Sequence, residues 1–396
     1  MTINNEHKKL NVPNLRFKEF QGEWTTSLLS DYLTENKERN KKGEFDKTDV
    51  LSVSGDYGIV NQIELLGRSF AGASVLPYHV VRHGNIVYTK SPLKEYPYGI
   101  VKANTGVDGI VSTLYAVYNI KNNVDAQFIE YYFSSANRTN RYFKPIVRIG
   151  AKHDMKIGNQ EVLANKVTFP NLEEQTKIGS LFRFLDERIA TQNKIIEDLK
   201  KLKCAIIEKV YSEIQGKEYS YGQLFDVVNE RNKQMEYSNI LSASQEKGMV
   251  NRDDLNLDIQ FERSNINTYK IVKKGNYVIH LRSFQGGFAF SDKLGVCSPA
   301  YTILRPNSLL EYGYLSNYFT SQRFIKSLVL VTYGIRDGRS INVDEWLRMK
   351  ITIPPKEHQQ YIVEVIGTFE RKIEDEEAYA AQLSKQKQYL LRQMFI

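Results

Sequence analysis

The sequence predicts an α+β fold: two similar mixed α/β globules separated by two long helices packed as an antiparallel coiled coil, with an internal pseudo-two-fold repeat. A β-like run closed by proline and followed by a helical stretch occurs twice, and Pro170 and Gln175 return as Pro354 and Gln359, at a constant offset of 184 positions. We therefore expect a first globule over residues 1–168, a central helix over 169–215, a second globule over 216–352 and a C-terminal helix over 353–396.

Each globule is expected to combine short strands with few long helices. Residues Glu38-Arg39-Asn40 return as Glu230-Arg231-Asn232. The strand-like runs are 84–88 and 109–118 in the first globule, and 275–280 and 296–304 in the second. An aromatic helical segment follows in each, over 126–135 and 312–321, and we expect its rings to pack in the core.

Both long helical stretches keep apolar heptads, which favour a coiled coil over a surface helix. A helix of ~40 residues would be ~60 Å long at 1.5 Å per residue. The seam positions of the first are Ile178, Phe182, Leu185, Ile189, Gln192, Ile196, Leu199, Lys203, Ile206 and Val210. Those of the second are Ile362, Ile366, Phe369, Ile373, Glu376, Ala380, Leu383, Lys387, Leu390 and Met394.

The two seams are interrupted by polar residues at matching places. Gln192 corresponds to Glu376, and Lys203 corresponds to Lys387. In an antiparallel register that places Lys203 opposite Glu376, Gln192 faces Lys387 and the remaining pairs are apolar. A polar residue in a seam costs stability but can fix register. The alternative is that each helix packs only on its own globule.

Two loops in each globule are candidates for contacts with a polyanion. A glycine loop with basic residues occurs at 148–153 and again at 333–339, and a second loop follows the Gly-Asn strand at 89–94 and at 281–287. Lys and Arg can reach phosphates, and Arg and Gln also suit base edges in the major groove. The candidate DNA-binding residues are Lys90, Ser91, Lys94, Arg148, Lys152, His153, Arg282, Ser283, Gln285, Tyr333, Arg336 and Arg339.

Composition narrows the class of protein. The chain has 396 residues, a formal net charge of +8 and 41% hydrophobic residues, which favours a globular protein with a polyanionic partner. It lacks a phosphate loop, a glycine-rich dinucleotide turn, and the HExxH and GxSxG motifs, so we expect no catalytic residues. The two cysteines form no CxxC motif and no metal site is indicated. We expect a cytoplasmic protein without a membrane segment.

At this point the chain resembles the specificity subunits of bacterial type I restriction–modification systems. The resemblance covers nearly the whole chain. It rests on the opening Pro13-Asn14-Leu15-Arg16-Phe17 with Trp24, on the two globules, and on the helix starts Phe169-Pro170…Glu174-Gln175 and Ile353-Pro354…Gln359. The second helix start lacks the Glu-Glu-Gln form of the first. The resemblance therefore does not imply that the two helix starts dock partner subunits equally strongly.

The resemblance implies a non-catalytic subunit in which each globule is a target-recognition domain for one half of a bipartite DNA site. It implies that the helices set the gap and dock two methyltransferase subunits, and that two motor-nuclease subunits join. S-adenosylmethionine, ATP and magnesium are then expected on those partners, with no cofactor on this chain. The alternatives are a stand-alone DNA-binding protein, an adaptor that does not bind nucleic acid, and an enzyme with a fused activity.

Overall fold

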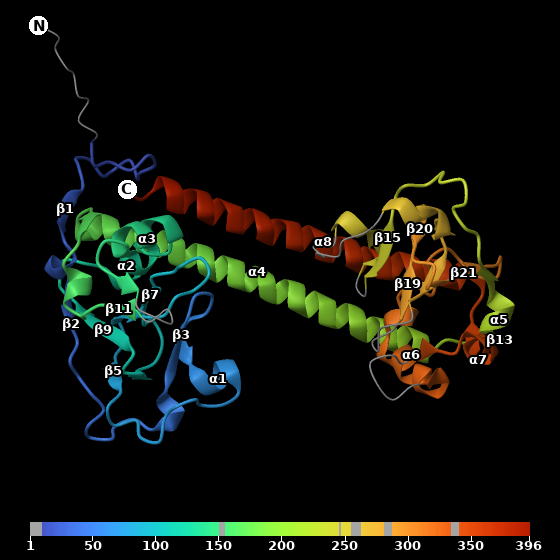
Figure 1. Cartoon of the computed structure of the whole chain (residues 1–396), viewed down its shortest axis with the longest axis horizontal. Coiled ribbons are helices and arrows are strands. Elements are labelled where there is room, and N and C mark those ends of the chain that lie inside the picture. The colour runs from blue at the N-terminus through green and yellow to red at the C-terminus, as the bar shows by residue number, and fades with distance from the viewer. Residues whose placement is uncertain (1–9, 150–154, 245–246, 255–262, 281–286, 334–339) are drawn as a thin grey trace, which may run out of the picture. The chain divides into compact units, whose positions relative to one another are not determined.

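The computed structural model describes residues 10–149, 155–244, 247–254, 263–280, 287–333 and 340–396. Its residues pack into two compact units, 1–192 with 379–396, and 193–378, so the unit boundary falls inside each long helix. The predicted α+β class and the pair of long helices are confirmed (Figure 1). No helix in the described ranges combines the length and the hydropathy that a membrane span requires.

The first unit holds a mixed set of short elements. Its strands are β1 (Thr25–Leu28), β2 (Leu33–Glu35), β3 (Leu51–Ser54), β4 (Gly58–Asn61), β5 (His79–Val81), β6 (Ile86–Thr89), β7 (Val101–Ala103), β8 (Gly109–Val111), β9 (Tyr115–Ile120), β10 (Arg148–Ile149), β11 (Met155–Lys156) and β12 (Lys166–Phe169). Its short helices are α1 (Gln62–Leu66), α2 (Ala126–Tyr132) and α3 (Ala136–Phe143). The long helix α4 spans Leu172–Ser212.

The second unit repeats this plan. Its strands are β13 (Lys217–Ser220), β14 (Phe225–Val228), β15 (Leu241–Ser244), β16 (Gly248–Asn251), β17 (Lys270–Val272), β18 (Tyr277–Ile279), β19 (Phe288–Phe290), β20 (Gly295–Cys297), β21 (Thr302–Pro306), β22 (Thr332–Tyr333), β23 (Ser340–Ile341) and β24 (Lys350–Ile353). Its short helices are α5 (Tyr221–Leu224), α6 (Gln322–Ser327) and α7 (Val343–Arg348). The long helix α8 spans Lys356–Gln393.

The sheet topology is the same in both units. The four-stranded sheet runs β2-β9-β6-β7 in the first unit and β14-β21-β18-β19 in the second. Each unit also pairs equivalent two-stranded elements: β1-β12 matches β13-β24, β3-β4 matches β15-β16, β5-β8 matches β17-β20, and β10-β11 matches β22-β23. The internal repeat that the sequence indicates is therefore a repeat of fold.

The central strand of each sheet is buried on both faces. Along β6, Ile86 and Tyr88 belong to a core cluster with α2 and α3, whereas Val87 belongs to a cluster on the other face. Along β18, Tyr277 likewise belongs to the core cluster on one face and Val278 to the cluster on the other face. Alternate side chains of a strand point to opposite faces, so a strand with apolar residues at successive positions separates two cores.

The second aromatic segment is not the expected helix. Residues 312–321 form turns and a 3-10 helix, Tyr318–Thr320, whereas 126–132 form α2 as predicted. Gly313 has φ +74°, a left-handed conformation that an α-helix does not contain. The expected core role of the aromatics is confirmed nonetheless, since Phe128, Phe133, Tyr314 and Phe319 are buried. The strand-like runs 109–118 and 296–304 each divide into two strands at a turn.

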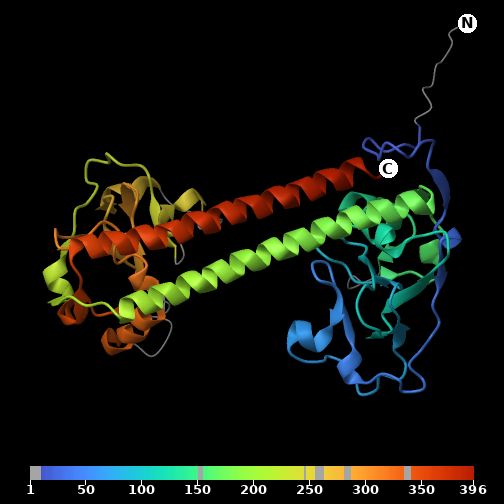
Figure 2. The same ribbon diagram turned by 180° about the vertical axis from the view of Figure 1, so that it is seen from behind.

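The long helices pack antiparallel within each unit (Figures 1 and 2). Every predicted seam position is buried or partly buried. The Lys203 ammonium donates to Glu370 at 2.7 Å, and that of Lys387 donates to Asp186. These two pairs are equivalent under the 184-residue repeat. They differ from the expected facing pairs, Lys203 with Glu376 and Gln192 with Lys387. Glu376 pairs with Lys372 on its own helix.

Candidate nucleic-acid interface

Two buried glutamines secure the starts of the long helices. The Gln175 amide donates to the carbonyl oxygens of Pro170 (2.9 Å) and Asn123 (3.3 Å) and accepts from the Asp125 amide (3.1 Å). Gln359 makes the equivalent three bonds, to Pro354 (3.0 Å), Leu309 (2.9 Å) and Glu311 (2.8 Å). Each glutamine thus ties its helix to the loop that precedes the aromatic segment, which explains why the same residue occurs at both helix starts.

The first helix start carries an additional contact. Glu174, fully buried, accepts from Nε and an Nη of Arg16, both at 2.7 Å, and from Trp24 Nε1 at 3.4 Å. Arg16 also donates to the Gly22 carbonyl oxygen at 2.6 Å and so holds the residues between them as a loop. His358 stands at the position equivalent to Glu174, and it is exposed. The residues that carry the family resemblance are therefore structural ones.

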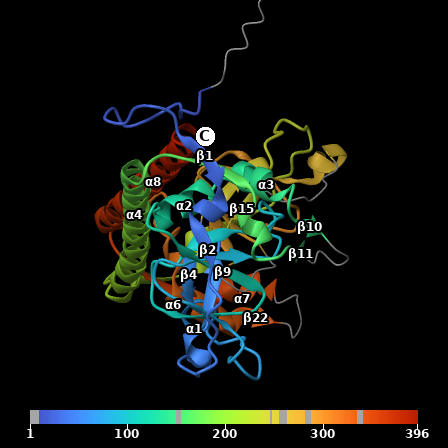
Figure 3. The same cartoon turned by 90° about the vertical axis from the view of Figure 1, so that its left-hand side faces the viewer.

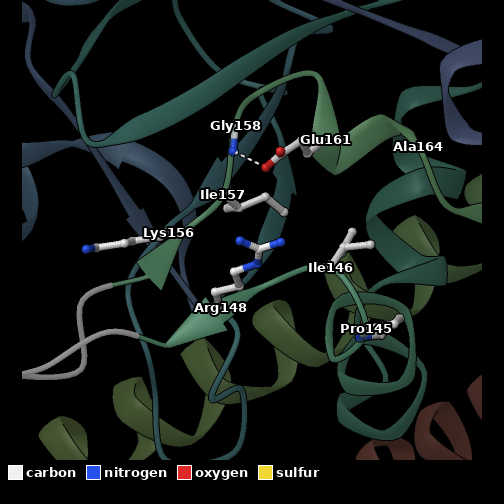
Figure 4. Close-up of a pocket in the computed structure, with 8 residues that line it drawn as sticks. All are labelled: Pro145, Ile146, Arg148, Lys156, Ile157, Gly158, Glu161 and Ala164. Atoms are coloured by element: carbon white, nitrogen blue, oxygen red, sulfur yellow. Dashed lines mark hydrogen bonds between the residues drawn. The ribbon is translucent and has the colours of Figure 1, made fainter.

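The β10–β11 ribbon presents two cations to solvent. Arg148 and Lys156 are cross-strand partners and both are exposed. Figure 3 shows the ribbon at the margin of the first unit, well separated from α4. A hollow of about 490 Å³ there is lined by both Arg148 and Lys156. In Figure 4 the Arg148 side chain extends between Ile157 and Ile146, and the Lys156 side chain extends in another direction. Neither cation has a side-chain partner among the described residues, so both are available to an anionic ligand. Lys152 and His153, at the ribbon tip, lie outside the described residues.

The turn between β6 and β7 forms a second exposed feature of the first unit. Leu93 and Tyr96 exchange backbone hydrogen bonds (3.0 and 3.1 Å), which leaves Lys94 at the tip of a tight turn. The Tyr96 hydroxyl donates to the Ser134 carbonyl oxygen, anchoring the turn to the segment between α2 and α3. Ser91 and Lys94 are exposed, as a surface contact requires.

Lys90 is directed inward instead. Its ammonium donates to the Ile157 carbonyl oxygen (3.0 Å) and to Asn159 Oδ1 (2.6 Å), and burial lowers its pKa. Ile157 and Asn159 follow the β10–β11 ribbon directly. Lys90 therefore joins the start of the β6–β7 turn to the segment that follows the β10–β11 ribbon. The turn and the ribbon are thus connected through this lysine.

Glu35, at the end of β2, completes this junction. It accepts from Asn159 Nδ2 (2.8 Å) and Gln160 Nε2 (2.7 Å). Burial raises the pKa of Glu35, but the two hydrogen bonds, together with the charges of Lys37 and His79, lower it, and the net shift of the pKa is downward. The Tyr118 hydroxyl donates to the Asn159 carbonyl oxygen at 2.9 Å. The roles of Glu35 and Asn159 could not be predicted from the sequence, because their partners are far away in the chain.

The equivalent features of the second unit are only partly described. The β22–β23 ribbon pairs Tyr333 with Ser340. Its tip, with Arg336 and Arg339, and the loop with Arg282, Ser283 and Gln285 lie outside the described residues. In the described ranges, no group of three or more His, Cys, Asp or Glu side chains could hold a metal ion.

Comparisons with known proteins agree with this geometry. Residues 216–385 match the family model described as type I restriction modification DNA specificity domain. One similar chain comes from a solved structure that describes the complex assembly and conformational transition of the type I R-M system. It is 13% identical over 94% of this chain and 97% of that chain, with a TM-score of 0.57. The type I restriction–modification system S subunit from M. genitalium is 12% identical over 97% and 99%, with a TM-score of 0.53. Among curated proteins, no sequence matches.

The repeated fold and the family match define a DNA specificity protein. Residues 216–385 belong to the type I restriction modification DNA specificity domain family, and the chain as a whole has the fold of the S subunit of such a system. The specificity domain that residues 216–385 match is non-catalytic in its family.

Proposed function

We propose that each unit reads one half of a bipartite duplex DNA site. The observation that carries this proposal is the repetition of one topology with different side chains in equivalent loops. A common scaffold fixes where each loop stands, and divergent side chains give each loop its own base contacts. Phosphate contacts by Lys and Arg would position the duplex, and loop residues would read base edges.

Within this proposal, the exposed cations Lys94, Arg148 and Lys156 contact DNA in the first unit, with Ser91 beside them. Lys90 serves as a positioning residue, since its ammonium is bonded inside the protein. Lys152 and His153 at the ribbon tip would add contacts to the first half-site. In the second unit, Arg282, Ser283, Gln285, Tyr333, Arg336 and Arg339 would read the other half-site.

The paired helices α4 and α8 would set the gap between the half-sites and dock the enzymatic partners. These are two methyltransferase subunits with S-adenosylmethionine and two motor-nuclease subunits with ATP and magnesium. Gln192, Lys203, Glu376 and Lys387 would fix the helix register. The pairs Lys203–Glu370 and Lys387–Asp186 support such a role, because each joins one helix to the other. Action on cellular DNA implies a cytoplasmic location.

The test is co-expression with a methyltransferase subunit of such a system in a host without DNA methylation, followed by sequencing of modified adenines. Two short specified blocks around a fixed gap are expected. Arg148→Gln should then alter the first block alone, and Arg336→Gln the second alone. Loss of both blocks in either variant would refute the modular reading, and a stable complex without new methylation would refute the methyltransferase role.

A further inference from the structure

Two loops of the protein share one conformation and differ in charge. We call residues 37–47 the Asn40 loop and residues 229–239 the Asn232 loop, which align at an offset of 192 positions. Asn40 Nδ2 donates to the Phe45 carbonyl oxygen (2.7 Å), and Asn40 Oδ1 accepts from the Phe45 amide (3.1 Å). Asn232 makes the same two bonds with Tyr237, at 2.7 and 3.2 Å. Both asparagines are buried.

The two loops also share a positive φ at one equivalent position, a conformation that residues other than glycine rarely adopt. Gly43 has φ +67°, and Met235, its equivalent, has φ +53°. Met235 is the one residue other than glycine with a positive φ in the described part of the chain. A side chain there is strained and persists only where the surrounding contacts impose that conformation. The asparagine contacts therefore determine the shape of both loops.

The loops differ in their lysines. The Asn40 loop carries Lys37, Lys41, Lys42 and Lys47, all exposed. The equivalent residues of the Asn232 loop are Asn229, Lys233, Gln234 and Asn239. Because the second loop keeps its shape with one lysine of the four, the other three lysines of the first loop are not needed to form it.

The carboxylates of the Asn40 loop already form ion pairs or hydrogen bonds within the protein. Arg82 donates to Glu38 (2.9 Å) and Glu44 (2.8 Å), and the Asp46 carboxylate accepts from the backbone amide of Thr48 (2.6 Å). The four lysines have no hydrogen bond or ion pair with any residue that the structure describes. Their ammonium groups can therefore bind an external anion; Lys37 and Lys42 act on Glu35 and Glu44 electrostatically, without a hydrogen bond.

The Asn40 loop also begins at the junction beneath the candidate interface. Glu35, two residues before Lys37, binds Asn159 and Gln160, which follow the β10–β11 ribbon. Arg39 then forms a β-bridge with His79 on β5. The strand that leads into the loop is thus joined to the segment that follows the ribbon, and the loop itself is held against β5.

We propose that the Asn40 loop contacts the phosphates of duplex DNA and that the Asn232 loop contributes fewer such contacts. This inference rests on the proposed function. Lysine binds phosphate as a point charge and releases condensed counterions, so it adds affinity without sequence information. Electrostatic contacts with phosphates would therefore contribute more of the DNA-binding free energy in the first unit than in the second.

The test transfers the neutral residues of one loop into the other. The variant Lys37→Asn, Lys42→Gln, Lys47→Asn takes side chains that the Asn232 loop already accommodates, so folding should persist. In complex with the methyltransferase subunit, the affinities for a specific and an unrelated duplex are measured against salt concentration. The log–log slope should become shallower by about 0.9 for each lysine that contacts a phosphate, or about 2.7 for three. The ratio of specific to unrelated affinity should not change.

Two further variants serve as controls. Asn229→Lys, Gln234→Lys, Asn239→Lys should steepen the slope. Lys18→Gln, Lys144→Asn, Lys166→Gln removes three exposed charges elsewhere in the first unit and should change the slope less. An unchanged slope in the Asn40-loop variant, or an equal loss in the Lys18 control, would overturn the proposal while leaving the bipartite reading intact. If the wild-type complex bound the motif found by adenine sequencing no more tightly than an unrelated duplex, that result would count against the proposed function itself.

Discussion

The buried glutamines Gln175 and Gln359 provide two matched perturbations in one chain. Each makes three hydrogen bonds with backbone groups of its own unit. Leucine has a similar volume but can neither donate nor accept. At about 1 kcal/mol of net stability per hydrogen bond, Gln175→Leu or Gln359→Leu should cost about 3 kcal/mol.

Amide hydrogen exchange gives a local assay. The Asp125 amide donates to Gln175, and the Glu311 amide donates to Gln359. Gln175→Leu should speed exchange at Asp125 and leave Glu311 unchanged, and Gln359→Leu should do the reverse. Urea unfolding should report similar losses of stability for the two variants, because the two bond sets are alike.

An exposed neighbour provides the control. Gln360 follows Gln359 but faces solvent, so Gln360→Leu should alter stability by less than about 0.5 kcal/mol. Exchange at Asp125 and Glu311 that is insensitive to the buried substitutions would refute the reasoning. So would a loss at Gln360 equal to that at Gln359, since the three hydrogen bonds would then not account for the effect.

Three further predictions concern single sites in the first unit. Glu174→Ala leaves Arg16 without its carboxylate partner and should destabilise the unit by about 3–5 kcal/mol in urea unfolding, whereas Arg16→Ala combined with it should cost little more. Gly99→Ala should destabilise by more than about 2 kcal/mol, because φ is +86° and a Cβ would lie 1.9 Å from the Thr89 carbonyl oxygen; the melting temperature reports this. Burial lowers the pKa of His79 to about 4, so the folded state binds fewer protons than the unfolded state between that pH and about 6.5. Stability should therefore fall as pH drops through this window, and His79→Phe should remove part of that dependence in acid titrations of unfolding.

Features that depend on local periodicity could be predicted from the sequence alone. Heptads located α4 and α8 to within a few residues, because a coiled-coil seam imposes its spacing on every turn. The 184-residue offset revealed the internal repeat before any topology was known. The repeated loops also contained three exposed candidates, Ser91, Lys94 and Arg148, which lie on a turn and on a two-stranded ribbon.

Which polar residues face inward could be known only from the folded structure. Lys90 and Lys94 are four residues apart, yet one ammonium is bonded to residues after β11 and the other lies at a turn tip. Glu174 and Glu173 are adjacent, yet only Glu174 is buried against Arg16 and Trp24. These differences arise from partners more than 60 residues away in the chain. A local pattern gives the side of a helix or strand, whereas the partner of a buried charge is set by the pairing of distant segments.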